Sequence, residues 1–341
     1  MRALYLLPLL CFFIGCNTSD KPIPDAARSM YYWRTTLQLD SVECAFLRNH
    51  HIKKIYLRLF DVIEQNGKPI PSATLTFPDN SNLPAGVHIV PVIFITENCL
   101  RTDTAGLAEH LVSRVQKMCE THQLPTANEL QIDCDWTPNS REAYFSLLHN
   151  IATILHAQGV CLSVTIRLHQ LSQPVPPADF GVLMLYNSGD FRQRHCPNPI
   201  FHTPDIEPYL KNLRSYSLPL CAAYPNFRWQ RLFHGEQFKG LLYSENLADS
   251  TIYEPQTTDS LYHVIQARTL HGELQRGYEI RLVPGDEVVV SRPDKNEVLS
   301  LARRLEAVRP GLHAQTIFYH LDHQNLHNLN TSTYEDIFNL P

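Results

Sequence analysis

Two aspartates two residues apart mark the stretch of this sequence that is best suited to chemistry. Asp133 and Asp135 fall within Leu130–Trp136, whose apolar, β-branched and aromatic content predicts a buried strand. Side chains alternate across a strand, so both acids point to the same side. In an ordinary core each charge would raise the pKa of the other, at a cost of roughly several kcal/mol. We therefore expect the pair to form a site, and the alternative is a strand end whose acids are solvated or bound to Arg or Lys.

The elements around the pair predict an α/β architecture. A turn at Thr137–Ser140 leads into a helix predicted over Ser140–Gln158, so the acids lie at the carboxyl end of a strand that enters a helix. Strand and helix patterns alternate about eight times along the chain, which favours a (β/α)8 barrel over an open sheet. A glycine-rich phosphate loop does not follow the first strand, which argues against a dinucleotide. We expect no cofactor.

The predicted elements follow from apolar runs and helical periodicity. Strands are expected at Tyr31–Leu37, Lys54–Val62, His88–Thr96, Leu130–Trp136, Val160–Leu168, Gly181–Tyr186, Pro219–Tyr224 and Gln315–Leu321, and helices at Asp40–Asn49, Thr104–His122, Ser140–Gln158, Asp205–Arg214 and Lys295–Val308. The stretch 64–86 is expected to be a long excursion, for which a small hairpin is one form. Within an irregular insertion around 227–292, we expect strands at Phe238–Tyr243 and Glu279–Val283 and a helix at Leu261–Leu274.

Composition sets the class of protein and argues against one class of partner. Of the 341 residues, 44% are hydrophobic and 18% charged, so the chain can bury a sizeable core. The formal net charge of −5 argues against nucleic acid as a partner. The cysteines lie mostly in apolar segments and show no metal-binding spacing, so we interpret them as small buried hydrophobes.

The N-terminus predicts export. Met1-Arg2 precedes an apolar run of about 11 residues, Leu4–Ile14, which is too short to span a bilayer but fits the core of a signal peptide. The sequence Phe13–Cys16 (FIGC) resembles the lipobox of bacterial lipoproteins, which implies acylation of Cys16 and anchoring in the cell envelope, with the outer membrane expected. The predicted organisation is a signal peptide at 1–15, a flexible tether at 16–28 and a barrel domain at 29–341; a plain secretory signal is the alternative.

Polar and aromatic side chains gather where the predicted strands end. In a barrel these positions share one rim, so we expect them to form a binding site for a polar ligand. Besides the aspartate pair, the expected rim residues are Arg58, Asp61, Glu97, Asn98, Arg167, His169, Tyr186, Asn187, Tyr224, His320 and Asp322. Arg167 could equally be a structural partner of the acid pair, and His169 a structural rim histidine. A metal held by the two aspartates and His169 is conceivable, but no HxH or HxxxH spacing supports one, and none is expected.

Two motifs carry a resemblance to a known family. The run Asp133–Pro138 (DCDWTP), followed by Arg141–Tyr144 (REAY), resembles the fourth-strand motif of glycoside hydrolase family 18, the chitinase-like barrels. Met184–Asn187 (MLYN) resembles the sixth-strand motif of that family, Met-x-Tyr-Asp, with Asn187 in place of the aspartate. The resemblance implies that Asp135 orients an acetamido group of the substrate and that Tyr186 steadies the reacting carbonyl.

The sequence departs from the family at the general acid. Thr137 stands where the family has its glutamate. A threonine cannot donate a proton at neutral pH, and loss of a general acid costs about 10²–10⁴-fold in rate. The barrel could then bind a glycan without cleaving it. It could instead hydrolyse with Asp133 or Asp135 and a relocated acid such as Glu97 or Asp61 in a two-carboxylate scheme, or be a structural or assembly lipoprotein without a small ligand.

Aromatic residues near the predicted rim could stack on sugar rings. Trp229 lies in a predicted loop and is the better candidate, whereas Trp136 could equally be a core residue. We therefore expect an exported, lipid-anchored barrel that binds a glycan at the carboxyl ends of its strands, with the aspartate pair at the centre.

Overall fold

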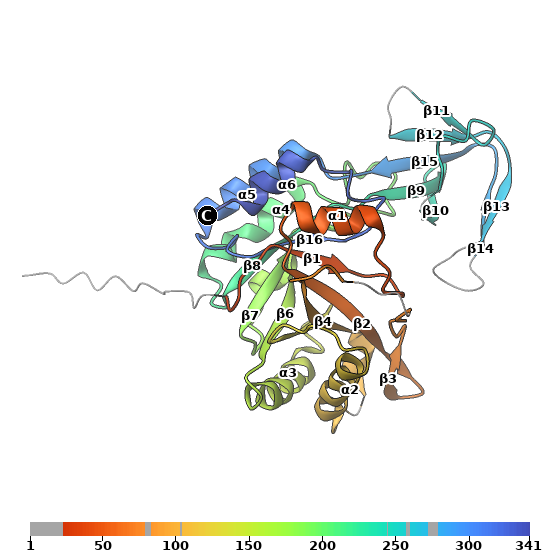
Figure 1. Cartoon of the computed structure of the whole chain (residues 1–341). Helices are drawn as coiled ribbons and strands as arrows, with labels where there is room; N and C mark the ends of the chain where they lie inside the picture. The colour runs from red at the N-terminus through yellow and green to blue at the C-terminus, as the bar shows by residue number, and fades with distance from the viewer. Residues whose placement is uncertain (1–22, 79–82, 103, 244, 257–259, 272–278) are drawn as a thin grey trace, which may run out of the picture.

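The computed structural model of the protein describes residues 23–78, 83–102, 104–243, 245–256, 260–271 and 279–341. Eight parallel strands close into a barrel, because the first strand pairs with both the second and the last (Figure 1). In barrel order the strands are β1 (Ser29–Tyr32), β2 (Lys54–Gln65), β4 (His88–Ile95), β5 (Glu129–Cys134), β6 (Cys161–Arg167), β7 (Phe180–Met184), β8 (Leu220–Pro225) and β16 (Thr316–Tyr319). This confirms the predicted (β/α)8 fold.

The barrel strands are buried along most of their length because side chains cover both faces. All six residues of β5 and all five of β7 are buried, as expected for parallel strands packed between a barrel interior and an outer layer. The fourth barrel strand is β5 and the sixth is β7, so the two motif-bearing segments occupy the positions that the resemblance implies.

Helices cover the outside of the barrel between most strands. They are α1 (Ser41–Asn49), α2 (Leu107–Thr121), α3 (Arg141–His156), α4 (Thr203–Ile206), α5 (Lys295–Val308) and α6 (Thr331–Phe338), with 3-10 turns at η1 (Glu97–Arg101), η2 (Leu168–Ser172) and η3 (Glu207–Ser215). The segment between β2 and β4 instead forms β3 (Lys68–Ser72), which pairs with β2 as a hairpin. Only η2 stands between β6 and β7, where Pro174, Pro176 and Pro177 disfavour a longer helix.

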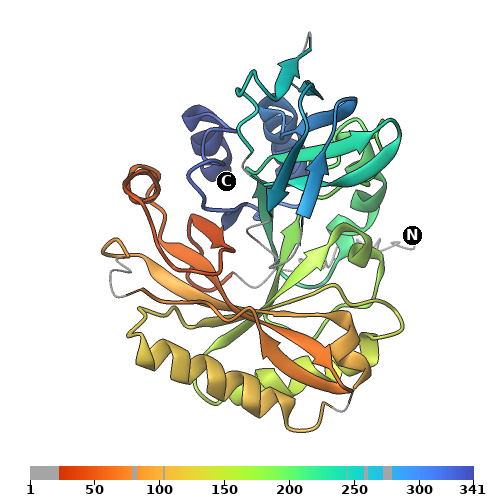
Figure 2. The same cartoon turned by 90° about the vertical axis from the view of Figure 1, so that its right-hand side faces the viewer.

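The insertion after β8 forms an antiparallel unit with its own small core. Its five-stranded sheet contains β9 (Trp229–His234), β10 (Gln237–Leu242), β11 (Tyr253–Pro255), β12 (Leu261–Val264) and β15 (Asp286–Ser291), and a hairpin joins β13 (Arg268–His271) to β14 (Glu279–Leu282). The unit projects beside the barrel, and Figure 2 views the molecule from that side. The helix predicted over Leu261–Leu274 is wrong for the described residues 261–271, because β12 pairs with β11 and β15 and β13 pairs with β14. The last three residues of that prediction lie outside the described residues.

The N-terminal predictions lie largely outside the described residues. The signal peptide and Cys16 fall within residues 1–22. Among the helices that the structure describes, none is long and apolar enough to cross a membrane.

Candidate functional site

A cavity of about 1000 Å³ opens at the carboxyl ends of the barrel strands. Its volume lies at the upper end of the range of small-molecule sites. The barrel contributes residues from the ends of β1, β4, β5, β6, β7, β8 and β16, and Leu241–Tyr243 of the insertion complete the wall. The carboxyl-end rim and the insertion therefore build the cavity together.

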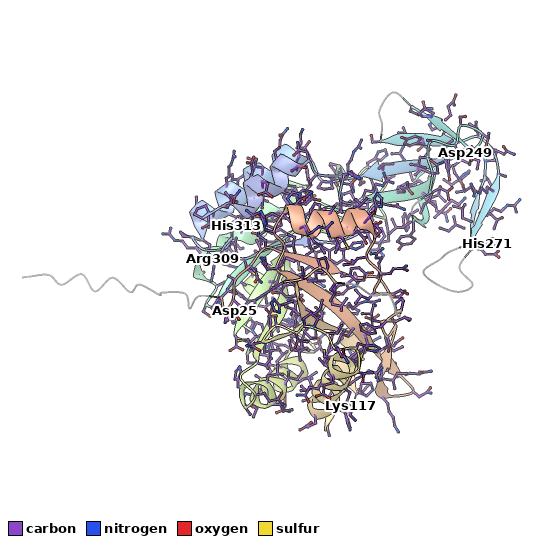
Figure 3. All side chains as sticks on the ribbon, in the orientation of Figure 1. Asp25, Lys117, Asp249, His271, Arg309 and His313 are labelled. Carbon is purple, nitrogen blue, oxygen red and sulfur yellow. The ribbon has the colours of Figure 1, made fainter. Side chains whose placement is uncertain are left out.

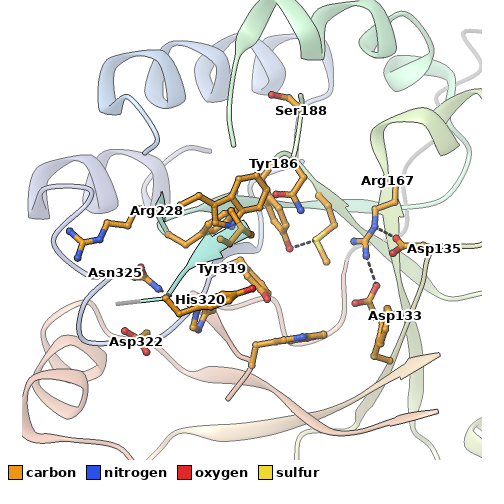
Figure 4. A pocket seen from close by; sticks show the side chains of 18 of the residues that line it. Asp133, Asp135, Arg167, Tyr186, Ser188, Arg228, Tyr319, His320, Asp322 and Asn325 are labelled. Atoms are coloured by element: carbon orange, nitrogen blue, oxygen red, sulfur yellow. Dashed lines mark hydrogen bonds and ion pairs between the residues drawn. The ribbon is translucent and has the colours of Figure 1, made fainter. Parts of the chain in front are cut away.

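An arginine holds both aspartates at one side of the cavity (Figure 4). Arg167, the last residue of β6, donates from Nη2 to Asp133 Oδ1 at 3.0 Å and from Nε to Asp135 Oδ1 at 2.5 Å. Thr165 of the same strand donates to Asp133 Oδ1 at 2.6 Å. Buried Gln170 accepts from the Arg167 backbone N–H at 2.8 Å and donates to the Trp136 carbonyl, so the ends of β6 and β5 are held in register.

The two aspartates differ in their electrostatic surroundings. The Asp133 side chain is 5% exposed and burial raises its pKa, although Arg167 and Thr165 favour the charged form. The Asp135 side chain is 58% exposed. Burial works against the charge of Arg167, but the two carboxylates outweigh that effect and raise its pKa. The cluster thus contains a permanent cation, and such a cation opposes the use of either carboxyl as a proton donor.

Thr137 stands where chitinase-like barrels have their general acid, and here it makes a structural hydrogen bond. Its hydroxyl donates to Glu97 Oε1 at 2.5 Å, and Ser140 donates to the same oxygen at 3.0 Å. These hydrogen bonds, that of Thr137 first, lower the pKa of Glu97, which makes it a poor general acid. Neither Thr137 nor Glu97 lines the cavity. The structure therefore does not support the expected catalytic part for Glu97, which anchors the loop after β5.

Aromatic rings in mutual contact form the middle of the cavity. Tyr186 stacks on Tyr319 with ring centroids 5.3 Å apart, and Trp33 lies 5.7 Å from Tyr319. Phe227 contacts Tyr319 at 5.7 Å and Trp229 at 5.4 Å. Trp33, Tyr319 and Trp229 are only partly buried, so their faces remain available to a ligand.

The Tyr186 hydroxyl makes its hydrogen bond to another residue of the protein. It donates to Met184 Sδ at 2.9 Å, and burial raises its pKa well above the ordinary value. Tyr186 can therefore act only as a neutral hydrogen-bonding group. Asn187, which follows it, is exposed and has a φ of 55°.

A second group of polar residues faces the aspartate cluster across the aromatic rings (Figure 4). It comprises His320 and Asp322 after β16, Asn325, and Arg228 in the loop after β8. Asn325 Nδ2 lies 3.2 Å from His320 Nε2, and burial lowers the pKa of His320 to about 4. His320 is thus neutral at physiological pH.

The structure brings most of the sequence-predicted residues together. Those that line the cavity are Asp133, Asp135, Arg167, His169, Tyr186, Asn187, Trp229, His320 and Asp322. His169 lies beside Asp135 with much of its surface exposed. The loss of water around the rest of its ring lowers its pKa. Their roles in binding or catalysis stay predictions.

Two predicted aromatic ligands are core residues instead. Trp136 is 1% exposed and packs against Tyr144 and Phe145 of α3. Tyr224 is fully buried, and its hydroxyl lies 2.8 Å from Nε2 of His313, on the side of the barrel away from the insertion (Figure 3). Neither ring lines the cavity, and both make their contacts with the layer outside the barrel, Trp136 with α3 and Tyr224 with His313 after α5.

Arg58 and Asp61 also lie outside the cavity wall. Arg58 Nη1 donates to both carboxylate oxygens of Asp61 at 2.8 Å, and its guanidinium lies 5.9 Å from the centroid of the Trp33 ring. Strand β2 continues to Gln65, so Asp61 pairs with Ser72 of β3 instead of ending a strand. We interpret this ion pair as a support for Trp33.

Several lining residues were not predicted as ligands. Tyr319 belongs to a strand that was predicted, so its position at the strand end was a usable signal. Arg34, Ser188, Arg228, Asn325 and Tyr243 lie in loops or in the insertion, and their approach to the cavity depends on tertiary packing. Among the described residues, no group of three or more His, Cys, Asp or Glu side chains could hold a metal ion, and the seven described cysteines are free thiols.

Comparison with solved structures finds a similar barrel fold in chitinases and spore cortex-lytic enzymes. The spore cortex-lytic enzyme SleL of Bacillus cereus aligns with a TM-score of 0.55 and 16% identity, over 92% of this chain and 76% of that chain. A chitinase from Chromobacterium violaceum gives 0.54 and 12%, over 92% and 98%, and SleL of Bacillus megaterium gives 0.53 and 12%, over 94% and 76%. At these identities the likeness is one of fold. No protein-family model and no curated protein matches the sequence.

Proposed function

We propose that this chain binds a glycan in the rim cavity and does not hydrolyse it by the acetamido-assisted mechanism of chitinase-like barrels. The observation that carries the proposal concerns the positions that are catalytic in chitinase-like barrels. Arg167 binds both aspartates, and Thr137 stands in place of the glutamate and donates to Glu97. The aromatic rings of Trp33, Tyr319 and Trp229 supply faces on which sugar rings can stack.

The fold of known glycan-active proteins supports this choice of ligand. The similar structures include a chitinase and cortex-lytic enzymes. The two sequence motifs lie on β5 and β7, the fourth and sixth barrel strands, as the resemblance to glycoside hydrolase family 18 implies. Fold alone does not determine function, so the proposal depends on the residues of the cavity.

A titration of the purified full-length chain with a glycan panel tests the binding proposal. The panel contains chitooligosaccharides, peptidoglycan fragments and cellooligosaccharides, and binding is measured by calorimetry. We expect at least one class to bind, and Trp229→Ala to weaken it at least about fivefold, because a stacking ring contributes on the order of 1 kcal/mol. Tyr262→Ala is the matched control, since Tyr262 is a partly buried ring of the insertion that does not line the cavity. Absence of binding by every class contradicts the proposal and favours the structural or assembly lipoprotein.

An active hydrolase with a relocated acid is the second candidate, and Asp322 favours it. Asp322 lines the cavity on the side opposite Asp135, and its Oδ1 accepts a hydrogen bond from the Gln324 backbone N–H at 2.9 Å. Two carboxylates across a sugar are the arrangement of two-carboxylate hydrolysis. This candidate predicts release of reducing ends that is lost in both Asp322→Asn and Asp135→Asn, whereas the binding proposal predicts no release from the wild type.

We also propose that the barrel is held on the bacterial cell envelope, at the outer membrane, by a lipid on Cys16. The support is the N-terminal sequence: a positive start, a short apolar run and the motif Phe13–Cys16. Metabolic labelling with an alkyne fatty acid should mark the wild type in the outer-membrane fraction and should not mark Cys16→Ser. Equal labelling of both chains, or no labelling of either, contradicts the anchor.

A further inference from the structure

The three arginines that line the cavity differ in their partners. Arg34 donates to both carboxylate oxygens of Glu43 at 2.8 Å. Arg167 holds the aspartate pair. Arg228 is exposed, and the described part of the chain offers its side chain no hydrogen bond or ion pair. Arg228 is therefore a cavity cation whose charge the described residues leave uncompensated.

The carboxylates of the cavity, in contrast, have cationic neighbours. Asp133 and Asp135 contact Arg167. The charge of Asp322 favours the protonated form of Arg34. Asp322 also lies near the neutral ring of His320. A cationic ligand would have to compete with these arginines, whereas an anionic ligand would find Arg228 without a competing carboxylate.

The backbone that carries Arg228 is fixed on both sides. Asn226 donates its backbone N–H to the Tyr319 carbonyl at 2.9 Å and its side-chain amide to the Tyr334 hydroxyl at 3.1 Å. Gln230 donates to the Glu245 carbonyl at 2.9 Å and accepts from the Glu245 backbone N–H at 3.1 Å. A guanidinium presented from a fixed loop loses less conformational entropy when it binds a ligand.

The residues on either side of Arg228 are ring residues of the cavity. Phe227 and Trp229 line it with centroids 5.4 Å apart. Arg228 and Trp229 line the same cavity, so a glycan stacked on Trp229 shares that cavity with the guanidinium. The planar guanidinium matches a carboxylate, which it can bind through two parallel hydrogen bonds.

Resting on the proposed glycan-binding function, we infer that the ligand is an acidic glycan and that Arg228 binds its carboxylate. The carboxylate can belong to a uronic acid or to a carboxyalkyl ether or peptide substituent of an amino sugar. Both sources present the same group to the arginine, so the experiment has an arm for each.

Calorimetric titration of the full-length chain with matched acidic and neutral oligosaccharides tests this inference. The first arm compares oligogalacturonate with its methyl ester, and the second compares a peptidoglycan disaccharide fragment with a chitooligosaccharide. In one of the two arms we expect the acidic member to bind about fivefold more tightly, because an exposed ion pair contributes up to about that factor. The preference should shrink as the salt concentration rises.

Variants assign the preference to the residue. Arg228→Gln should bind acidic and neutral members equally, whereas Arg303→Gln should retain the preference. Arg303 is an exposed arginine of α5 that does not line the cavity, and the described residues likewise give its side chain no ion pair. Because both positions are exposed, both variants should melt at the wild-type temperature.

Three results would overturn the inference. They are equal affinity for acidic and neutral members, a preference that survives in Arg228→Gln, and tighter binding of a cationic amino-sugar oligomer. Each of these leaves the proposed glycan binding intact. Failure of every oligosaccharide to bind the wild type overturns the proposed function together with the inference.

Discussion

Replacing Arg167 with glutamine removes a cation that contacts both aspartates of the cavity. In the wild type Arg167 Nη2 lies 3.0 Å from Asp133 Oδ1, and the Asp133 side chain is 5% exposed. After the substitution Asp133 keeps the hydrogen bond from Thr165 but loses the charge that compensates its own. The variant therefore leaves a buried carboxylate in the barrel without its ion pair.

The expected loss of stability follows from burial. Removing one partner of a fully buried ion pair costs about 3–5 kcal/mol. The Arg167 side chain is 23% exposed, so water can replace part of its effect, and we expect a loss of about 2–3 kcal/mol in the free energy of unfolding at neutral pH. For a chain of this size the melting temperature should fall by about 5 °C.

The loss should depend on pH with a definite sign. Burial already raises the pKa of Asp133, and removal of Arg167 should raise it further. A carboxyl whose pKa is higher in the folded than in the unfolded state destabilises the fold once it ionises, because the unfolded chain holds the charge at lower cost. The difference between wild type and Arg167→Gln should therefore be small at acid pH and grow as the pH rises through the folded-state pKa of Asp133.

Urea unfolding of four chains between about pH 5 and pH 8 measures this effect. Arg167→Gln with Asp133→Asn should recover most of the lost stability, since the neutral amide needs no counter-charge. Asp135→Asn is the exposed control and should change stability by less than about 1 kcal/mol. Equal stability of Arg167→Gln and wild type across the pH range would refute the reasoning, as would a loss that the Asp133→Asn change does not recover.

Three further predictions concern single residues. Tyr224→Phe should lower the free energy of unfolding by about 1 kcal/mol, because the His313 ring loses its partner, and should leave glycan affinity unchanged in calorimetry. His320 stays neutral in the fold down to about pH 4, whereas it protonates near 6.5 when unfolded, so wild-type stability should fall as the pH drops through that window and His320→Asn should flatten the fall in urea titrations. Glu97→Gln should lower the melting temperature of the chain, since it weakens the hydrogen bonds from the loop after β5, without changing glycan affinity.

The barrel was predictable because its signals are local and repeated. The period of apolar residues places a helix at Lys295–Val308, and α5 has those bounds. Strand β5 lies within the predicted Leu130–Trp136 apart from its first residue, since a strand covered on both faces is a nearly continuous apolar run. Eight such alternations left the closed parallel barrel as the favoured architecture.

The insertion was less predictable because its strands are short and its central pairings, those of β15 with β9 and β12, join segments far apart in the sequence. Residues 261–264 form β12 by pairing with β11 on one side and with β15 on the other, and β15 lies more than twenty residues further along the chain. The local apolar pattern over Leu261–Leu274 fits helix and strand alike, and tertiary pairing decides between them.

The site residues that could be predicted are those at the carboxyl ends of barrel strands, where such barrels place their sites. The acid pair and Arg167 follow directly from positions at the carboxyl ends of β5 and β6. Tyr224 was misassigned because a strand end alone does not say which face a side chain takes, and a shift of one residue exchanges the faces. Asp61 was misassigned because β2 continues into a hairpin. The part of the wall that comes from the insertion depends on tertiary packing.

Detection of products in the same sample in which binding is measured tests the central claim most directly. The full-length chain is incubated with the glycan that binds most tightly, and reducing ends are counted while calorimetry confirms saturation. We predict a bound glycan that stays intact, with no more reducing ends from wild type than from Asp135→Asn. Reducing ends that accumulate with the wild type and disappear in Asp135→Asn would contradict the account and identify a hydrolase.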